Sequence, residues 1–364
     1  MRQSYKPEER VIFALRDLYR RYGYAPFKMS KFETYELYMQ NKDFLVSDGI
    51  ITFTDTDGTL MALKPDVTLS IVKNFRPATP LRKVHYSENV YRTAGAGRPY
   101  REIMQTGLEC LGQVGLYEIC EVILLAARSL QIISPDFVLD LSHMQIVSDL
   151  MDSLSLSAEQ KSRALEAIAE KNEDALRELC CPLTDEQTRL LLTLLDLSGS
   201  MGKVLPALEE FCTTESACCA FAQLQTIYEL LCQNDLQDHV QLDFSMVNDM
   251  NYYNGIVFRG YVQGIPTGIL SGGQYDKLMK KMGKDAGGIG FAVYLDQLER
   301  LDQRKKEYDV DTVILYQQSD DILQLSAMAQ TMSEKGESVL LLRTLPESLR
   351  CKTVLRFTEG RLVP

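Results

Sequence analysis

Several features are missing from this sequence of 364 residues, and each absence excludes a class of protein. Neither terminus carries an apolar run typical of a signal peptide or a membrane span, so we expect a soluble, cytoplasmic protein without membrane partners. The sequence has no Walker loop, and the glycine cluster at residues 287–290 is too short for a dinucleotide fingerprint. Asp and Glu (50) outnumber Lys and Arg (39), and the net charge of -11 disfavours tRNA or another nucleic acid as a partner.

Histidine is scarce, with three residues, although the sequence contains nine cysteines. No CxxC pair has a matching partner pair of ligands, which the usual zinc sites require. The cysteines are typical of small hydrophobic side chains in a core. We therefore predict no metal, no disulfide framework and no cofactor.

The order of the predicted elements divides the chain into a long first part and a short second part. Residues 7–22 have the apolar period of a helix that ends at Gly23, and residues 51–63 have a hairpin pattern around Asp57 and Gly58. Residues from about 155 to 238 are rich in Leu, Ala, Glu and Gln, which predicts a helical insertion. Residues 309–364 offer a strand, a helix and a second strand, a small βαβ-like unit with a tail. We expect two domains, residues 1–308 and 309–364.

A hairpin with one polar face is predicted between residues 83 and 110. Alternating apolar residues flank a glycine-containing loop at residues 93–99, as two strands around a turn would. In the second strand the period of two places Arg101, Ile103, Gln105, Gly107 and Glu109 on one face. That face suits the floor of a pocket, although on this pattern alone a solvated face is equally well supported.

Two more segments, with the run KPDVT at residues 64–68, complete a recognisable set. One is NYYNGIVF at residues 251–258, and the other is SGGQYD at residues 271–276. Together with PFKMSKFETYELY (26–38), the hairpin from Arg92 to Glu109 and GIGFAVYLDQL (288–298), they resemble motifs of the histidine branch of the class II aminoacyl-tRNA synthetases, in the same order. This resemblance spans most of residues 1–300. It implies an α+β fold with an antiparallel sheet flanked by helices, and a dimer formed through motif 1.

The resemblance also implies an amino-acid pocket for histidine. Free histidine carries an ammonium group, a carboxylate and an imidazole with two distinct nitrogens, so its site needs acidic and paired polar groups. The resemblance assigns the ammonium end to Asp66, Thr68 and Gln105, and the imidazole to Glu109, Tyr253 and Tyr275. Tyr252 and Arg92 border the predicted site.

Two residues depart from the synthetase pattern where an activating enzyme has arginine. Asn248 stands four residues before the tyrosine pair, and Gln297 stands at the end of motif 3. An amide lacks the charge and the five-donor fork of arginine, and the loss of even one preorganised donor typically costs ~10²–10³ in rate. We therefore predict no aminoacylation activity, with Asn248 and Gln297 as lost catalytic positions. The alternative is a shifted alignment in which Arg259 or Arg300 supplies the charge.

A histidine pocket without activation chemistry resembles the regulatory subunit of ATP phosphoribosyltransferase, the synthetase-like partner of the short catalytic form in histidine biosynthesis. KPDVT and YYNGIVF, with Gly255 in place of the synthetases' arginine, favour this branch. The resemblance implies a noncatalytic homodimer within a hetero-oligomer, which makes the short-form catalytic subunit sensitive to feedback inhibition by L-histidine. An active histidyl-tRNA synthetase and an orphan histidine sensor remain as alternatives.

Overall fold

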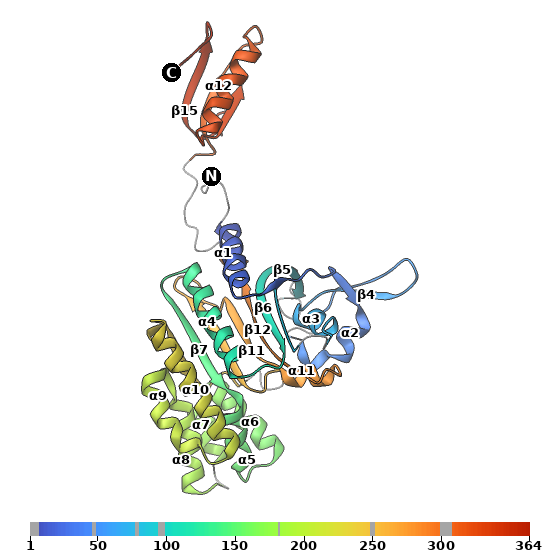
Figure 1. Cartoon of the computed structure of the whole chain (residues 1–364), viewed down its shortest axis with the longest axis vertical. Coiled ribbons are helices and arrows are strands. Elements are labelled where there is room, and N and C mark those ends of the chain that lie inside the picture. Colours follow the sequence, from blue (N-terminus) through green and yellow to red (C-terminus); the bar gives the residue numbers. More distant parts are fainter. Residues whose placement is uncertain are drawn as a thin grey trace. The chain divides into compact units, whose positions relative to one another are not determined.

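The computed structural model describes residues 7–45, 49–76, 80–93, 99–180, 183–247, 252–298 and 308–364. These residues group into two compact units, one within residues 7–298 and one within residues 308–364 (Figure 1). Among them, no helix is long and apolar enough to cross a membrane. The domain boundary expected after residue 308 stays a prediction.

The first unit is built on a nine-stranded sheet with the order β1-β5-β6-β12-β11-β10-β7-β9-β8. The pairs β1/β5 and β7/β9 are parallel, and the other neighbours are antiparallel. The predicted sheet is therefore mainly antiparallel, with one parallel pair toward each edge. In sheet order the strands span Ala25–Pro26, Leu81–Thr93, Tyr100–Gly112, Gly287–Tyr294, Leu270–Gln274, Ile256–Val262, Phe137–His143, Val240–Asp243 and Ser198–Ser200.

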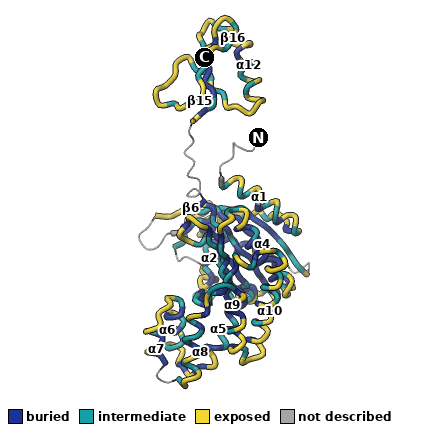
Figure 2. Tube along the Cα trace, turned by 90° about the vertical axis from the view of Figure 1, so that its left-hand side faces the viewer, coloured by how far each residue is buried: buried dark blue, intermediate teal, exposed yellow. Residues whose placement is uncertain are grey.

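The hairpin predicted between residues 83 and 110 is present as β5 and β6, although residues 94–98 of its loop lie outside the described residues. Period-two alternation separates its faces as predicted. Leu108 and Cys110 join the large core beneath helix α4 (Leu116–Ile133), whereas Gln105, Gly107 and Glu109 face the opposite side. From Gln105 onward this face is not solvated, because Gln105 and Glu109 are buried, whereas Arg101 near the start of the strand is exposed. Figure 2 shows the burial of the described residues along the trace of the chain.

One side of the sheet is covered by α1 (Pro7–Arg21) and α4. Leu15 and Tyr19 of α1 are fully buried, and Gly23 follows the helix with a φ of 82°, which ends it as predicted because glycine adopts this conformation at little cost. Apolar side chains of α4 pack along the sheet because the helix is apolar over most of its surface.

The other side of the sheet carries smaller elements that enclose the polar face. They are a three-stranded sheet and four short helical segments. The predicted hairpin around Gly58 is present as β3 and β4 of that sheet. The elements are β2 (Phe32–Thr34), α2 (Tyr35–Gln40), η1 (Lys42–Phe44), β3 (Thr52–Thr54), β4 (Leu60–Leu63), α3 (Thr68–Lys73) and α11 (Asp276–Lys281).

The predicted insertion is helical, with one departure. Within the segment predicted as helical, Ser198–Ser200 forms β8 and pairs with β9 at the edge of the main sheet. Three residues with this composition give no strand pattern, so the pairing with β9 decides their structure. The helical elements between β7 and β9 are α5 (Met144–Ser153), α6 (Ala158–Ala169), α7 (Glu173–Leu179), α8 (Asp185–Asp196), α9 (Met201–Leu208), η2 (Glu209–Phe211), α10 (Glu215–Gln233) and η3 (Gln237–His239).

The second unit contains the predicted strand-helix-strand, with β13 (Val310–Leu315) and β14 (Val339–Leu342) parallel and α12 (Ile322–Glu334) between them. The segment predicted as a tail instead forms β15 (Cys351–Thr358) and β16 (Arg361–Val363), which extend the sheet to the order β14-β13-β15-β16. β15 carries polar residues on both faces, so its sequence shows no clear strand period.

Candidate functional site

A cavity of about 530 Å³ lies over the polar face of the main sheet. This volume suits a small-molecule ligand. Residues from β5, β6, β10, β11 and β12 form its floor, and the segments before α3 and before β10 contribute its walls. The structure brings all eight predicted ligand-binding residues into this one lining: Asp66, Thr68, Arg92, Gln105, Glu109, Tyr252, Tyr253 and Tyr275.

Glu109 is the most deeply enclosed acid of the cavity, with 2% of the residue exposed. Thr68 donates a hydrogen bond to its Oε1 over 2.7 Å, and Tyr275 donates one to its Oε2 over 2.5 Å. Burial raises the pKa of Glu109 to about 8, although both hydrogen bonds act in the opposite direction. This raised pKa favours the protonated form of the carboxyl group at the base of the cavity.

Two glycines of the floor allow these side chains to lie close to the sheet. A Cβ at Gly290 would collide with the carboxylate of Glu109, and a Cβ at Gly288 would collide with the ring of Tyr275. Both positions face neighbouring strands at close range, so a larger residue would displace the two groups that bond to each other. The glycines of GGIG thus leave the space that Tyr275 of SGGQYD and Glu109 occupy.

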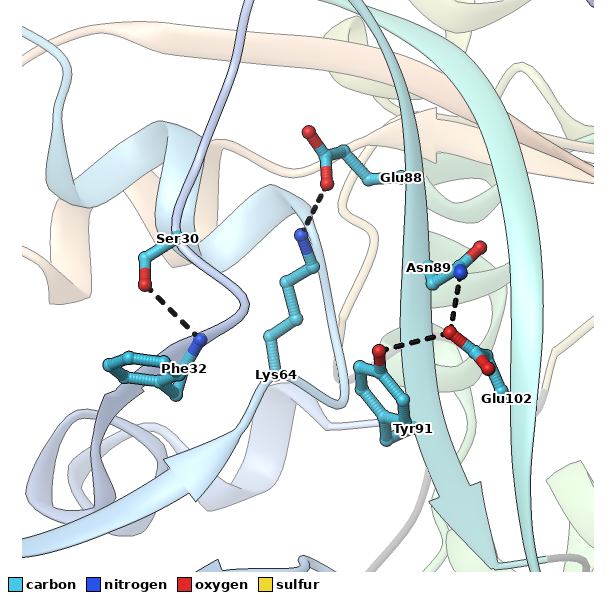
Figure 3. A network of polar contacts seen from close by, with 7 residues as sticks. All are labelled: Ser30, Phe32, Lys64, Glu88, Asn89, Tyr91 and Glu102. Atoms are coloured by element: carbon cyan, nitrogen blue, oxygen red, sulfur yellow. Dashed lines mark hydrogen bonds and ion pairs between the residues drawn. The ribbon is translucent and has the colours of Figure 1, made fainter. Parts of the chain in front are cut away.

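The loop at residues 64–68 is fixed to the sheet by a buried ion pair (Figure 3). Lys64 is completely buried, and its Nζ lies 2.7 Å from Oε2 of Glu88 on β5. The backbone N–H of Tyr91 also donates to the carbonyl of Lys64. On the next strand Glu102 accepts hydrogen bonds from Tyr91 and Asn89, away from the cavity. Lys64 therefore serves as an anchor, which explains why a basic residue precedes Pro65.

Arg92 and Asp66 meet at the edge of the cavity. Nε of Arg92 donates to the carbonyl of Pro65 over 2.6 Å, and its Nη2 lies 3.8 Å from Oδ2 of Asp66. Oδ1 of Asp66 accepts from the backbone N–H of Leu69 at the start of α3. Burial raises the pKa of Asp66, while Arg92 acts to lower it. Arg92 thus holds the acid-bearing loop in place as well as lining the site.

The tyrosine pair and Gln105 complete the predicted set. The ring centroids of Tyr252 and Tyr253 are 4.6 Å apart, and those of Tyr252 and Tyr275 are 6.2 Å apart. Gln105 is 2% exposed, and its amide nitrogen has no hydrogen-bond partner within the described structure. An orphaned donor inside a cavity is a candidate contact for a bound ligand.

The positions where the synthetase pattern has arginine are described only in part. Asn248 and the candidate replacement Arg300 lie outside the described residues. Gln297 follows β12, bonds to Asp296 over 2.9 Å, and does not contribute to the lining that the structure describes. Arg259, the other candidate arginine, does line the cavity from β10.

The cavity has further lining residues that were not predicted from the sequence, among them Tyr86 and Tyr294. Strand alternation could have indicated some of them once pairing was known, since Tyr86 lies opposite Gly107 and Tyr294 lies opposite Gln105. The pairing register itself was not readable from the sequence. In the part of the chain that the structure describes, no three His, Cys, Asp or Glu side chains are placed to hold a metal ion.

Comparison with known proteins identifies the family. The model of the histidyl-tRNA synthetase family matches residues 2–298. An ATP phosphoribosyltransferase regulatory subunit from Caldanaerobacter subterraneus subsp. tengcongensis is 30% identical over 322 residues, which cover 84% of this chain and 82% of the relative. The chain belongs to the histidyl-tRNA synthetase-like family of ATP phosphoribosyltransferase regulatory subunits. The predicted regulatory role in histidine biosynthesis is confirmed at this level.

Two solved structures share the fold of this family. An ATP phosphoribosyltransferase regulatory subunit/histidyl-tRNA synthetase from Bacillus halodurans C gives a TM-score of 0.80 at 24% identity, with 98% of this chain and 96% of the other covered. The ATP phosphoribosyl transferase (HisG:HisZ) complex from Thermotoga maritima gives 0.63 at 18% identity, with 79% and 97% covered. The predicted class II synthetase-like fold is confirmed.

The raised pKa of Glu109 predicts a specific pH dependence of stability. Because the pKa rises from an ordinary 4.5 to about 8 on folding, the stabilising effect of the proton is complete below about pH 4.5 and lost as pH rises through about 8. Glu109→Gln, which stays neutral, should lack this loss. We expect the melting temperature of the ligand-free variant to rise relative to that of the ligand-free wild type as the pH increases from 5 to 8.5. A constant difference across this range would contradict the assigned protonation.

Proposed function

We propose that this chain binds L-histidine in the cavity over Glu109 and thereby makes a short-form ATP phosphoribosyltransferase catalytic subunit sensitive to histidine. The observation that carries the proposal is the buried Glu109, bonded by Thr68 and Tyr275, at the base of a cavity that all eight predicted residues line. Family membership supplies the regulatory context. As the partner of a biosynthetic enzyme, the chain would work in the cytoplasm.

An imidazole complements the state of Glu109. A carboxyl group with a pKa of about 8 can pass its proton to a ring nitrogen of pKa near 6.5 only if the resulting ion pair is stabilised in the cavity. Thr68 and Tyr275 already donate to both carboxylate oxygens, so they stabilise the charged form that this transfer creates. A ligand with an apolar side chain would leave Glu109 without this partner, at a cost that favours histidine.

The remaining groups suit the amino-acid end of the ligand. Asp66 is an acid for the ammonium group, and Gln105 offers its amide to the same region. The rings of Tyr252 and Tyr253 provide flat apolar surfaces for the imidazole. Hydrogen bonds with a charged partner contribute roughly 1.5–3 kcal/mol each, so two or three of them together with burial of the imidazole ring offset much of the cost of association.

Histidine sensitivity requires coupling between this cavity and a catalytic partner. The Thermotoga maritima complex joins HisG and HisZ, and it contains a chain with this fold, which supports an assembly of the same kind. A coupling free energy of ~1–3 kcal/mol between histidine binding and the state of the assembly gives 5- to 150-fold regulation. This coupling free energy is small compared with the free energy of ligand binding. A modest difference in histidine affinity between two assembly states is therefore enough.

Apolar side chains on the small sheet support the proposed homodimer. Phe32 and Phe53 are 43% and 38% exposed, and their rings meet edge to face with centroids 5.5 Å apart. Leu60 on β4 and Met39 on α2 are also more than a third exposed. These residues lie in or beside the segment that resembles motif 1, and clustered exposed apolar residues are typical of interaction surfaces.

The first experiment concerns the ligand. L-histidine should raise the melting temperature of the wild-type protein by mass action, with a shift that increases with concentration. Glu109→Ala should reduce this shift because it removes the proposed partner of the imidazole. Tyr275→Phe should reduce it because it removes a hydroxyl that donates to the carboxylate of Glu109. Glu102→Ala is the matched control, since Glu102 lies on the same strand but outside the cavity lining. If millimolar histidine shifts none of these proteins, the histidine site is refuted.

The second experiment concerns the homodimer. Phe53→Lys places a charge on the exposed apolar surface and should weaken self-association at least tenfold without loss of secondary structure. Leu323→Lys is the control, because Leu323 is equally apolar and 83% exposed but belongs to the second unit. Sedimentation velocity measures both variants. A Phe53→Lys protein that dimerises as strongly as the wild type would place the interface elsewhere.

The third experiment concerns the catalytic partner. Mixed with a short-form ATP phosphoribosyltransferase from the same organism, the chain should form a stable hetero-oligomer on size-exclusion chromatography and confer inhibition by histidine. Glu109→Ala should still enter the complex but lose at least tenfold of the sensitivity to histidine, whereas Glu102→Ala should keep it. Inhibition that stays unchanged in the Glu109→Ala complex would assign the regulatory site to the catalytic subunit.

A further inference from the structure

A short segment lies at the boundary between the cavity and solvent. It consists of η1 and Leu45, and we call residues 42–45 the mouth segment. Asp43 and Leu45 contribute to the cavity lining, while 77% of the Asp43 side chain is exposed to solvent. A side chain that lines a cavity and also faces solvent marks the opening of that cavity. The mouth segment therefore lies where a small ligand would pass between solvent and the cavity floor.

The backbone of the mouth segment forms a single turn. The N–H of Phe44 donates to the carbonyl of Asn41, and the N–H of Leu45 donates to the carbonyl of Lys42, each over 3.0 Å. An isolated turn of this kind is not stable by itself, because few hydrogen bonds offset the entropy of ordering it. The position of the mouth segment therefore depends on the side-chain contacts that it makes with other elements.

On its inner side the mouth segment rests on the aromatic wall of the site. Phe44 is 6% exposed, and its ring meets the ring of Tyr252 edge to face, with centroids 5.8 Å apart. Tyr252 in turn contacts Tyr275, whose hydroxyl donates to Glu109. Edge-to-face contacts of this kind are favourable for aromatic pairs. One ring thus connects the mouth segment to the base of the cavity.

On its outer side the mouth segment is held by Lys281, the last residue of α11. The Nζ atom of Lys281 lies 2.9 Å from Oδ2 of Asp43 and 5.1 Å from the ring centroid of Phe44. One ammonium group therefore contacts both an acid and an aromatic ring of the same turn. The hydrogen bond and the charge of Lys281 also hold the pKa of Asp43 below its usual value, so the pair stays charged at neutral pH.

The helix that carries Lys281 is itself fixed. Leu278 and Met279 of α11 are fully buried, and Tyr275, which precedes the helix, is bonded to Glu109. The six residues of α11 span about 9 Å at ~1.5 Å per residue, from the turn beside the floor to the mouth segment. Lys281 therefore extends from an anchored element to a single turn, and loss of its contacts should release the turn rather than move the helix.

We infer that Lys281 holds the mouth segment closed over the cavity and thereby sets the rate at which the ligand enters and leaves. Lys281 is a positioning residue, since it lies outside the cavity lining and acts through Asp43 and Phe44. Its contacts do not involve the ligand, so their loss should favour opening equally in the free and the bound protein. The statement about the ligand rests on the proposed histidine site, whereas the hold on the mouth segment is measurable without a ligand.

The first test measures the rates of L-histidine binding at pH 7.5. The chain has no tryptophan, so stopped-flow tyrosine fluorescence can follow binding in the tyrosine-lined cavity. Lys281→Met should raise kon and koff together by about 3- to 20-fold, the effect of one exposed ion pair and one cation–π contact. The Kd from calorimetry should change by less than about twofold, because the same opening step precedes entry and exit. Lys281→Arg, which can keep both contacts, should restore the wild-type rates.

The second test needs no ligand. Hydrogen exchange of the free protein, followed by mass spectrometry, reports on the amide N–H groups of Phe44 and Leu45. Lys281→Met should accelerate their exchange by the same factor as the two binding rates. Lys280→Met is the matched control in both tests, since Lys280 is the exposed preceding residue of α11 and lies outside the cavity lining. It should behave as the wild type.

The outcomes separate this inference from the proposed function. A rise in koff alone, with a weaker Kd, would show that Lys281 shapes the bound site and would overturn the inference. Unchanged rates and exchange in Lys281→Met would also overturn it, while the histidine site stands. If the wild type binds no histidine, the proposed function fails. Faster exchange in Lys281→Met would then still support the hold on the mouth segment, and unchanged exchange would refute it.

Discussion

The buried carboxyl group of Glu109 imposes the constraint on which the rest of the site depends. An acid with 2% exposure is costly unless each oxygen has a donor, and Thr68 and Tyr275 supply these donors from two different segments of the chain. The requirement fixes where the loop before α3 and the turn before α11 must lie relative to β6. It also explains glycine at position 290, because any side chain there would occupy the space of the carboxylate.

A second polar pair fixes the position of the loop at residues 64–68, which forms part of the cavity wall. Lys64 and Glu88 join the loop to β5, and Arg92 binds the carbonyl of Pro65 from the same strand. Such pairs are costly to desolvate and are best understood as devices that fix geometry. Here they hold Asp66 and Thr68 at the cavity. A fold shared with histidyl-tRNA synthetases thus keeps a shaped cavity in a chain with a neutral glutamine at position 297.

The sequence predicted those parts of the structure that local patterns determine. The alternation in β6 assigned Gln105 and Glu109 to one face, and the motif order brought Tyr252, Tyr253 and Tyr275 to the same cavity. Pairing between distant strands was not predictable, because register depends on contacts that no local pattern contains. For that reason β8 was not predicted within the helical insertion, and β15 and β16 were expected as a tail. The cross-strand neighbours that put Arg259 among the residues lining the cavity were not apparent either.

The most direct test of the account is a crystal structure of the wild-type chain grown with saturating L-histidine. The account predicts histidine in the cavity over the main sheet, with its imidazole hydrogen-bonded to Glu109 and its ammonium group within reach of Asp66. Glu109 should keep its contacts with Thr68 and Tyr275 when the ligand is present. Histidine bound at another surface, with this cavity empty, would contradict the central claim.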